Sequence, residues 1–122
     1  MKKRTVKKNT EYQLQKAVCK YLDLKNVLYC GSMGGQYQVF RSQRIKSKKT
    51  GYKKGFPDLF IYESRGGFHG LAIELKAGYY NKPTVEQLEW IGRLTNNGYL
   101  ATVCRNLDET IGIINAYLKL KK

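Results

Sequence analysis

Acidic residues are scarce in this sequence of 122 residues. It contains 9 Asp and Glu residues against 23 Lys and Arg residues, so its formal net charge at pH 7 is +14. An excess of this size predicts a polyanionic partner. Nucleic acid is the first candidate, and an anionic membrane surface is the second.

Long hydrophobic runs and metal-binding cysteine or histidine clusters are also missing. No apolar run approaches the roughly 20 residues that span a bilayer, and no apolar segment follows the basic start of the chain. We therefore expect neither a transmembrane segment nor a secretory signal. The cysteines, at 19, 30 and 104, form no CxxC pair and His69 is the only histidine, so we expect neither a disulfide framework nor a zinc site. These absences favour an intracellular protein, in the cytoplasm, the nucleoid or, in a eukaryotic host, the nucleus.

The remaining composition is ordinary for one small folded domain. Hydrophobic residues make up 42% of the chain and charged residues 26%. These values are too apolar for a disordered chain, and the length is that of a single domain. We expect a basic tail over residues 1–9 and one domain over residues 10–122.

The positive charge is concentrated in three segments that hold 15 of the 23 basic residues. Two segments are the ends of the chain, where solvated tails explain the charge as well as binding does. The third is internal, contains no acid and leads directly into Gly-Phe-Pro-Asp at 55–58. Either it is a solvated loop, or its cations hold a phosphate backbone next to a carboxylate, which is the interpretation we favour. Its basic residues are Arg41, Arg44, Lys46, Lys48, Lys49, Lys53 and Lys54.

Periodicity and capping residues predict three helices. Thr10 is expected to cap the first, and Thr84 with Gln87 forms a capping box for the second. Asn106 or Asp108 is expected to cap the last. The second helix is expected to bury Leu88, Ile91 and Leu94.

Alternation and turn residues predict the strands. We expect them at 27–30, 37–40, 58–62, 70–76 and 99–104, with a hairpin between 58–62 and 70–76 that turns at Arg-Gly-Gly. Helices and strands in this order predict an α/β fold with a small sheet flanked by helices.

A candidate chemical site lies on the predicted hairpin. Side chains two apart on a strand share a face, so Glu74 and Lys76 project together at the end of a buried strand, and Asp58 on the neighbouring strand can reach them. Two carboxylates, a backbone carbonyl and waters suit Mg²⁺, and the lysine can activate a water or offset phosphate charge. The structural alternative is a simple Glu74–Lys76 ion pair, with Asp58 capping a turn.

Five motifs in order resemble the VRR-NUC branch of the PD-(D/E)XK nuclease superfamily. They are Lys54-Gly-Phe-Pro-Asp-Leu, Phe68-His-Gly-Leu-Ala-Ile-Glu-Leu-Lys, Thr84-Val-Glu-Gln-Leu, Asn97-Gly-Tyr and Leu107-Asp-Glu-Thr-Ile. The resemblance covers residues 10–118. It implies a restriction-endonuclease-like α-β-β-β-α-β core with a small mixed sheet. It further implies that Asp58 and Glu74 ligate a divalent metal with the help of the Leu75 carbonyl, and that Lys76 is the catalytic lysine.

Two further residues match the family. Glu11 lies within the apolar stripe of the first helix. Either its charge interacts with the helix dipole near the N-terminus, or its side chain points inward at a polar site, and periodicity alone favours the first interpretation. The resemblance favours the second interpretation and implies that Glu11 supports a metal-bound water or a second metal. It also implies that Gln87 orients Lys76 or a phosphate.

The expected function is a Mg²⁺-dependent DNA endonuclease in which Mn²⁺ can substitute, with no organic cofactor. The small stand-alone members that this chain resembles are often encoded by phages or viruses. They cut branched DNA such as Holliday junctions as homodimers, so the resemblance implies both properties here. Two alternatives remain: a non-catalytic nucleic-acid-binding module of the same fold, and a sequence-reading restriction-type endonuclease. The complete set of Asp58, Glu74 and Lys76 argues against the first, and 122 residues leave little chain for the recognition element of the second.

Overall fold

A four-stranded mixed sheet forms the centre of the protein. The computed structural model describes residues 10–32 and 48–122. The strands are β1 (Tyr29–Gly31), β2 (Leu59–Ile61), β3 (Leu71–Leu75) and β4 (Leu100–Cys104), and they lie in the order β1-β2-β3-β4. Adjacent strands are antiparallel except β3 and β4, which are parallel and joined through a helix, as a parallel connection requires. The α/β class and the small mixed sheet predicted from the sequence are therefore confirmed.

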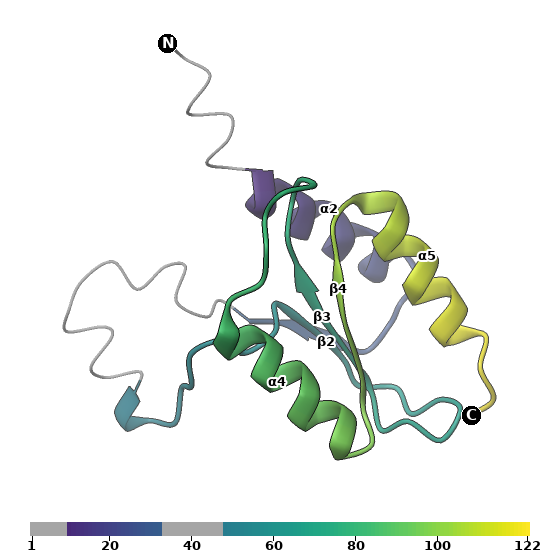
Figure 1. Ribbon diagram of the computed structural model, residues 1–122. Helices are drawn as coiled ribbons and strands as arrows, with labels where there is room; N and C mark the ends of the chain where they lie inside the picture. Colours follow the sequence, from purple (N-terminus) through teal and green to yellow (C-terminus); the bar gives the residue numbers. More distant parts are fainter. Residues whose placement is uncertain (1–9, 33–47) are drawn as a thin grey trace, which may run out of the picture.

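Three helices flank the sheet (Figure 1). Helices α2 (Thr10–Leu24) and α5 (Leu107–Leu118) contact each other and cover one face, and α4 (Val85–Asn96) covers the other. The capping box of α4 and the Asn106 cap of α5 form as predicted. Thr10 is the first helical residue of α2 rather than a residue before the helix.

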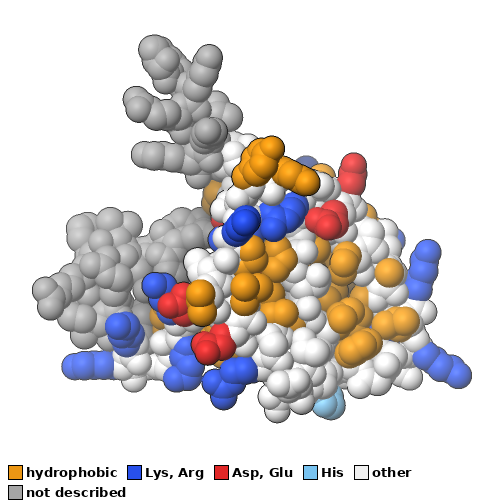
Figure 2. All heavy atoms as spheres, viewed as in Figure 1, with side chains coloured by type: hydrophobic (Ala, Val, Ile, Leu, Met, Phe, Trp, Pro, Cys, Tyr) orange, Lys and Arg blue, Asp and Glu red, His pale blue; other side chains and the backbone are white. Residues whose placement is uncertain are grey.

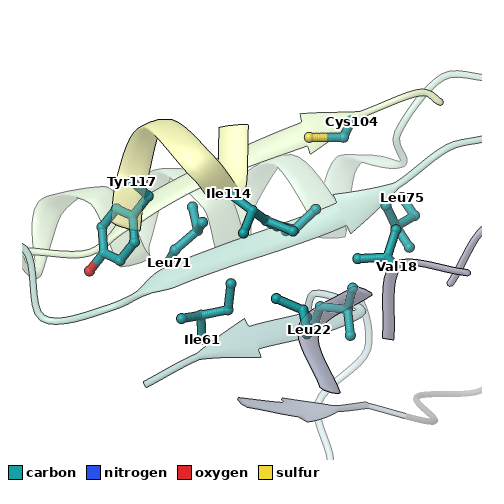
Figure 3. Close-up of a cluster of buried hydrophobic side chains, with 10 residues drawn as sticks. Val18, Leu22, Ile61, Leu71, Leu75, Cys104, Ile114 and Tyr117 are labelled. Carbon is teal, nitrogen blue, oxygen red and sulfur yellow. The ribbon is translucent and has the colours of Figure 1, made fainter. Parts of the chain in front are cut away.

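The main core lies between the sheet and the α2–α5 pair. Alternate residues of β2 and β3 point toward these helices, as strand geometry dictates. Figure 3 shows the side chains of α2 and α5 directed at those of the strands. The cluster consists of Val18, Leu22, Leu59, Ile61, Leu71, Ile73, Leu75, Cys104, Ile114 and Tyr117.

The opposite face of the sheet carries a layer of aromatic side chains and the polar site. Phe60 of β2 stacks between Phe56 and Tyr62, and Trp90 of α4 meets Phe56 edge-on at a centroid distance of 5.0 Å. Helix α4 has no fully buried residue, and Leu88, predicted to be buried, is 53% exposed. The first turn of α4 directs Gln87 at the sheet, so Leu88, one residue further round the helix, extends into solvent.

The predicted hairpin is present, with Arg65 and Phe68 bridging its turn. The strand predicted at 27–30 is shifted to Tyr29–Gly31, and the strand predicted at 99–104 begins one residue later, at Leu100. The strand predicted at 37–40 lies outside the described residues, as does the predicted basic tail at 1–9.

Candidate active site

The sheet brings Asp58 and Glu74 next to each other. Leu59 pairs with Ile73, so one further residue of the same register places Asp58 opposite Glu74. The Asp58 carboxylate is fixed there because its Oδ2 accepts a hydrogen bond from the Leu75 N–H at 2.8 Å. The N–H and C=O of one strand residue point to the same side, so the Leu75 carbonyl also faces the strand of Asp58. Three oxygen-bearing groups predicted to bind metal therefore converge at one end of the hairpin.

Glu74 is buried and only partly satisfied. It is 3% exposed, and its Oε2 accepts a hydrogen bond from Gln87 Nε2 at 2.8 Å, whereas its buried Oε1 has no hydrogen-bond partner within the described parts of the chain. Burial, followed by the nearby negative charge of Asp58, raises the pKa of Glu74 to about 9. Burial also raises the pKa of Asp58. Two acids held this way require a proton or a cation between them.

Lys76 extends from the same face as Glu74, two residues further along. It is 9% exposed, and its backbone N–H continues the ladder to the Cys104 carbonyl at 2.9 Å. Its positive charge partly offsets the rise in the pKa of both Asp58 and Glu74. In residues 10–32 and 48–122, the ion pair within 4.0 Å joins Glu63 to Arg65, so a direct Glu74–Lys76 ion pair does not explain this arrangement.

Gln87 links the start of α4 to the site. Its backbone N–H and its side-chain Oε1 complete the capping box with Thr84, at 3.2 and 2.8 Å. This leaves Nε2 to hold Glu74. The amide of Gln87 thus holds one of the two central acids, and the role toward Lys76 or a phosphate that the resemblance implied stays a prediction.

Glu11 lies beside this pair on α2. It is half-buried, and its negative charge raises the pKa of both Asp58 and Glu74. Its carboxylate accepts a hydrogen bond from Asn81 Nδ2. Among the described residues, no three His, Cys, Asp or Glu side chains group closely enough to hold a metal ion. Glu11 is therefore close enough to influence the two acids, and its inward role toward a metal stays a prediction.

Three residues that sequence reasoning missed support the site. Gln15 Nε2 donates to the Asp58 carbonyl at 3.3 Å, and Asn81 binds Glu11. Arg105 anchors the loop of Asn81 by donating to the carbonyls of Gly78 and Asn81. Gln15 lies one helical turn after Glu11, so the i, i+4 spacing could have identified it. Nothing local in the sequence marks Asn81 or Arg105.

The basic segment is described only in part. Lys48, Lys49, Lys53 and Lys54 are exposed, and Figure 2 shows Lys and Arg side chains gathered on the face that carries α4. Arg41, Arg44 and Lys46 lie outside the described residues. The exposed lysines immediately precede Asp58 in the chain, where cations can hold the backbone of a polyanion near the acids.

The donor set fits a hard divalent cation. Glu74 offers an oxygen that has no hydrogen-bond partner among the residues described, and Asp58 retains Oδ1 beyond its bond to Leu75. Strand geometry turns the Leu75 carbonyl to the same side. Carboxylate and carbonyl oxygens are the ligands that Mg²⁺ takes, with waters completing its octahedron. Residues Asp58, Glu74 and Leu75 would hold such an ion.

Two acids and a lysine lie at the end of the central hairpin of a mixed sheet, which is the arrangement that the nuclease resemblance implied. The chain belongs to the VRR-NUC domain family, whose model matches residues 4–107. It is also similar to a solved structure described as a VRR_NUC domain protein. That similarity has a TM-score of 0.73 and 31% sequence identity, and it covers 93% of this chain and 91% of the other. No curated protein matches the chain.

The family placement agrees with the resemblance inferred from the motifs, including the PD-(D/E)XK superfamily. It supports a nuclease with DNA as its substrate. Within the described ranges, no helix has both the length and the apolar character needed to cross a membrane.

Proposed function

We propose that this protein is a Mg²⁺-dependent endonuclease that hydrolyses phosphodiester bonds in DNA, with a preference for branched DNA. The observation that carries the proposal is the buried Glu74 carboxylate, which faces Asp58 and shares its side of β3 with Lys76. One of its oxygens lacks a hydrogen-bond partner within 10–32 and 48–122. Burying two acids together costs free energy, and a cation-dependent reaction explains why the fold maintains them.

A divalent cation held by Asp58, Glu74 and the Leu75 carbonyl would withdraw charge from the scissile phosphate and make water easier to deprotonate. Lys76 follows Glu74 on the same side of β3, so its ammonium group can position the attacking water and offset charge on the phosphate oxygens. The water oxygen gives up a proton to solvent and forms a bond to phosphorus, the bond from phosphorus to the leaving oxygen breaks, and that oxygen takes up a proton from solvent. Gln87 keeps Glu74 in place during this step, and the exposed lysines before Asp58 hold the flanking backbone.

The preference for branched DNA and a homodimeric state are parts of the same proposal. A single domain contributes one such site, and symmetric cutting of two strands needs two sites, which a two-fold dimer supplies. The net charge of +14 supports binding to DNA but would serve a non-catalytic binding module equally well. Cleavage therefore has to be measured directly.

The test compares a labelled four-way junction with a linear duplex of the same sequence. Each is incubated with the protein in Mg²⁺, in Mn²⁺ and in EDTA. We expect cleavage in either metal and none in EDTA, with the junction cut at least about tenfold faster, a difference of 1.4 kcal/mol. Binding without cleavage in every condition would support the binding module, whereas fixed cut positions in random duplex libraries would support the restriction-type enzyme.

A further inference from the structure

A cavity of about 500 Å³ lies beside the C-terminal half of α4. None of the residues that form the candidate metal site lines it. Its walls come from α4, from the segment before Asp58 and from the start of β4. Six of the lining residues carry the argument: Lys53, Lys54, Trp90, Arg93, Asn97 and Tyr99.

Two aromatic side chains form fixed, half-buried walls of this cavity. Trp90 donates from Nε1 to the Lys54 carbonyl at 3.1 Å and is buttressed by the edge of Phe56. Tyr99 meets Phe60 edge-on at 5.4 Å. Both residues line the cavity rather than lying within the closed core. Rigid aromatic walls of this kind suit the flat face of a nucleobase.

The polar part of the lining favours an anion. Lys53, Lys54 and Arg93 contribute three positive charges, against one negative charge from Glu89. Asn97 uses its Nδ2 to donate to the Arg93 carbonyl at 2.7 Å, so its side-chain oxygen is the atom that can accept from a base edge. Aromatic walls, excess positive charge and an amide together match a nucleotide, which combines a base with a phosphate.

The cavity and the candidate metal site share the same two supports. One is α4, whose first turn presents Gln87 to Glu74 and whose later residue Arg93 lines the cavity. The two residues are six positions apart, which is about 9 Å along the helix axis at 1.5 Å per residue. The other is the segment from Lys53 to Asp58. Gly55 in this segment has a φ of +90°, and a Cβ there would lie 2.7 Å from the Glu86 backbone, so the segment is pressed against α4. A nucleotide in the cavity therefore lies at a fixed separation from the nucleotide at the metal site. At the 3.4 Å rise of one strand, this separation is roughly two or three nucleotides.

We propose that this cavity receives one unpaired nucleotide of the DNA substrate. The inference rests on the proposed function and extends it, because it names the part of the DNA that the protein recognises. A base in a continuous duplex has both faces stacked and its edge paired, and unstacking it costs free energy. An unpaired base at a branch, bulge or end enters at little cost. The cavity thus gives a physical reason for preferring branched DNA over plain duplex.

Trp90 is the only tryptophan of the chain, so its fluorescence reports on the cavity. The experiment uses the full chain in EDTA, without cleavage. The probes are a fully paired hairpin duplex, the same hairpin with a single-nucleotide bulge, a short oligothymidylate and thymidine monophosphate. Affinity is followed in parallel by anisotropy of the labelled hairpins. We expect saturable quenching of Trp90 by the bulged hairpin and the oligothymidylate, and at least fivefold tighter binding of the bulged hairpin than of the paired one.

Two variants separate the cavity from general charge. Arg93→Ala removes an exposed cation of the cavity, and Lys20→Ala removes an exposed cation from α2 on the other face of the sheet. We expect Arg93→Ala to abolish the preference for the bulge and Lys20→Ala to retain it.

Equal affinity for the two hairpins would overturn the proposal. So would binding of the bulged hairpin without any change in Trp90 fluorescence. Quenching by thymidine monophosphate alone, with no preference for the bulge, would also overturn it and would identify a site for free nucleotides. Because no step requires metal or cleavage, an inactive protein that shows the bulge preference contradicts only the proposed function. An active nuclease that lacks the preference contradicts only this inference.

Discussion

Replacing Glu74 with Gln is expected to abolish DNA cleavage while stabilising the folded protein. Gln retains an oxygen that can accept the hydrogen bond from Gln87, but it removes a buried negative charge next to Asp58. Loss of a metal-binding carboxylate costs several kcal/mol of transition-state stabilisation, so cleavage in Mg²⁺ should fall by about a thousandfold or more. A structural acid would show no such loss.

The gain in stability should depend on pH with a defined sign. The pKa of Glu74 in the folded protein is about 9, above its ordinary value near 4.5, so between these values the folded state binds more protons than the unfolded state. The stability of the native protein in EDTA therefore decreases as pH rises through this range, and Glu74→Gln removes that contribution. At pH 8 we expect the variant to be more stable by on the order of 1–3 kcal/mol, measured by urea unfolding.

Glu63→Gln is the matched control, because Glu63 pairs with Arg65 away from the candidate site. It should leave cleavage unchanged and lower stability slightly, since partly exposed ion pairs contribute about 0–1 kcal/mol. A Glu74→Gln variant that cuts DNA like the native protein would show that Glu74 has no part in catalysis. A variant less stable than the native protein at pH 8 in EDTA would contradict the environment assigned to this carboxylate.

Lys76→Met is expected to lower cleavage by about a hundredfold to a thousandfold, the range typical for losing one group that stabilises charge in the transition state. Met preserves much of the apolar stem of this buried side chain, so the fold should be retained. Lys76 supplies no oxygen ligand and its positive charge opposes a cation at the acids, so affinity for a divalent cation should not fall in this variant. The effect should appear in the single-turnover cleavage rate rather than in DNA affinity.

Lys20→Met is the control for lost charge, because Lys20 is exposed on α2 and remote from the acids. It should cleave at the native rate. If Lys76→Met retained the native single-turnover rate, Lys76 would be a structural neighbour of the acids, and its role toward the attacking water and the phosphate would have to be abandoned.

Much of the fold followed from local patterns. The capping box at Thr84 and the turn after the strand of Asp58 are local features, and both form as predicted. The two-residue alternation that put Glu74 and Lys76 on one face also holds, because strand geometry depends little on distant contacts. Register then brought Asp58 to Glu74, and this too could be predicted once the hairpin was recognised.

Other parts depended on contacts between segments distant in sequence. Leu88 fits an apolar stripe, but its helix rests on the sheet through Gln87 and Trp90 and leaves Leu88 in solvent. Asn81 binds Glu11 across 70 positions, which no spacing rule predicts. Trp90 packs on Phe56 and also lines a charged cavity, which only the tertiary arrangement creates.

The central claim is that Asp58 and Glu74 form a divalent-cation site, and Mn²⁺ binding tests it most directly. Free Mn²⁺ is followed by electron paramagnetic resonance as the ion is titrated into the native protein, Asp58→Asn and Glu74→Gln, without DNA. We predict saturable binding to the native protein, displacement by Mg²⁺, and at least about tenfold weaker binding to each variant, because each loses a charged oxygen ligand. Equal binding by all three proteins, or no binding to the native protein, would contradict the claim.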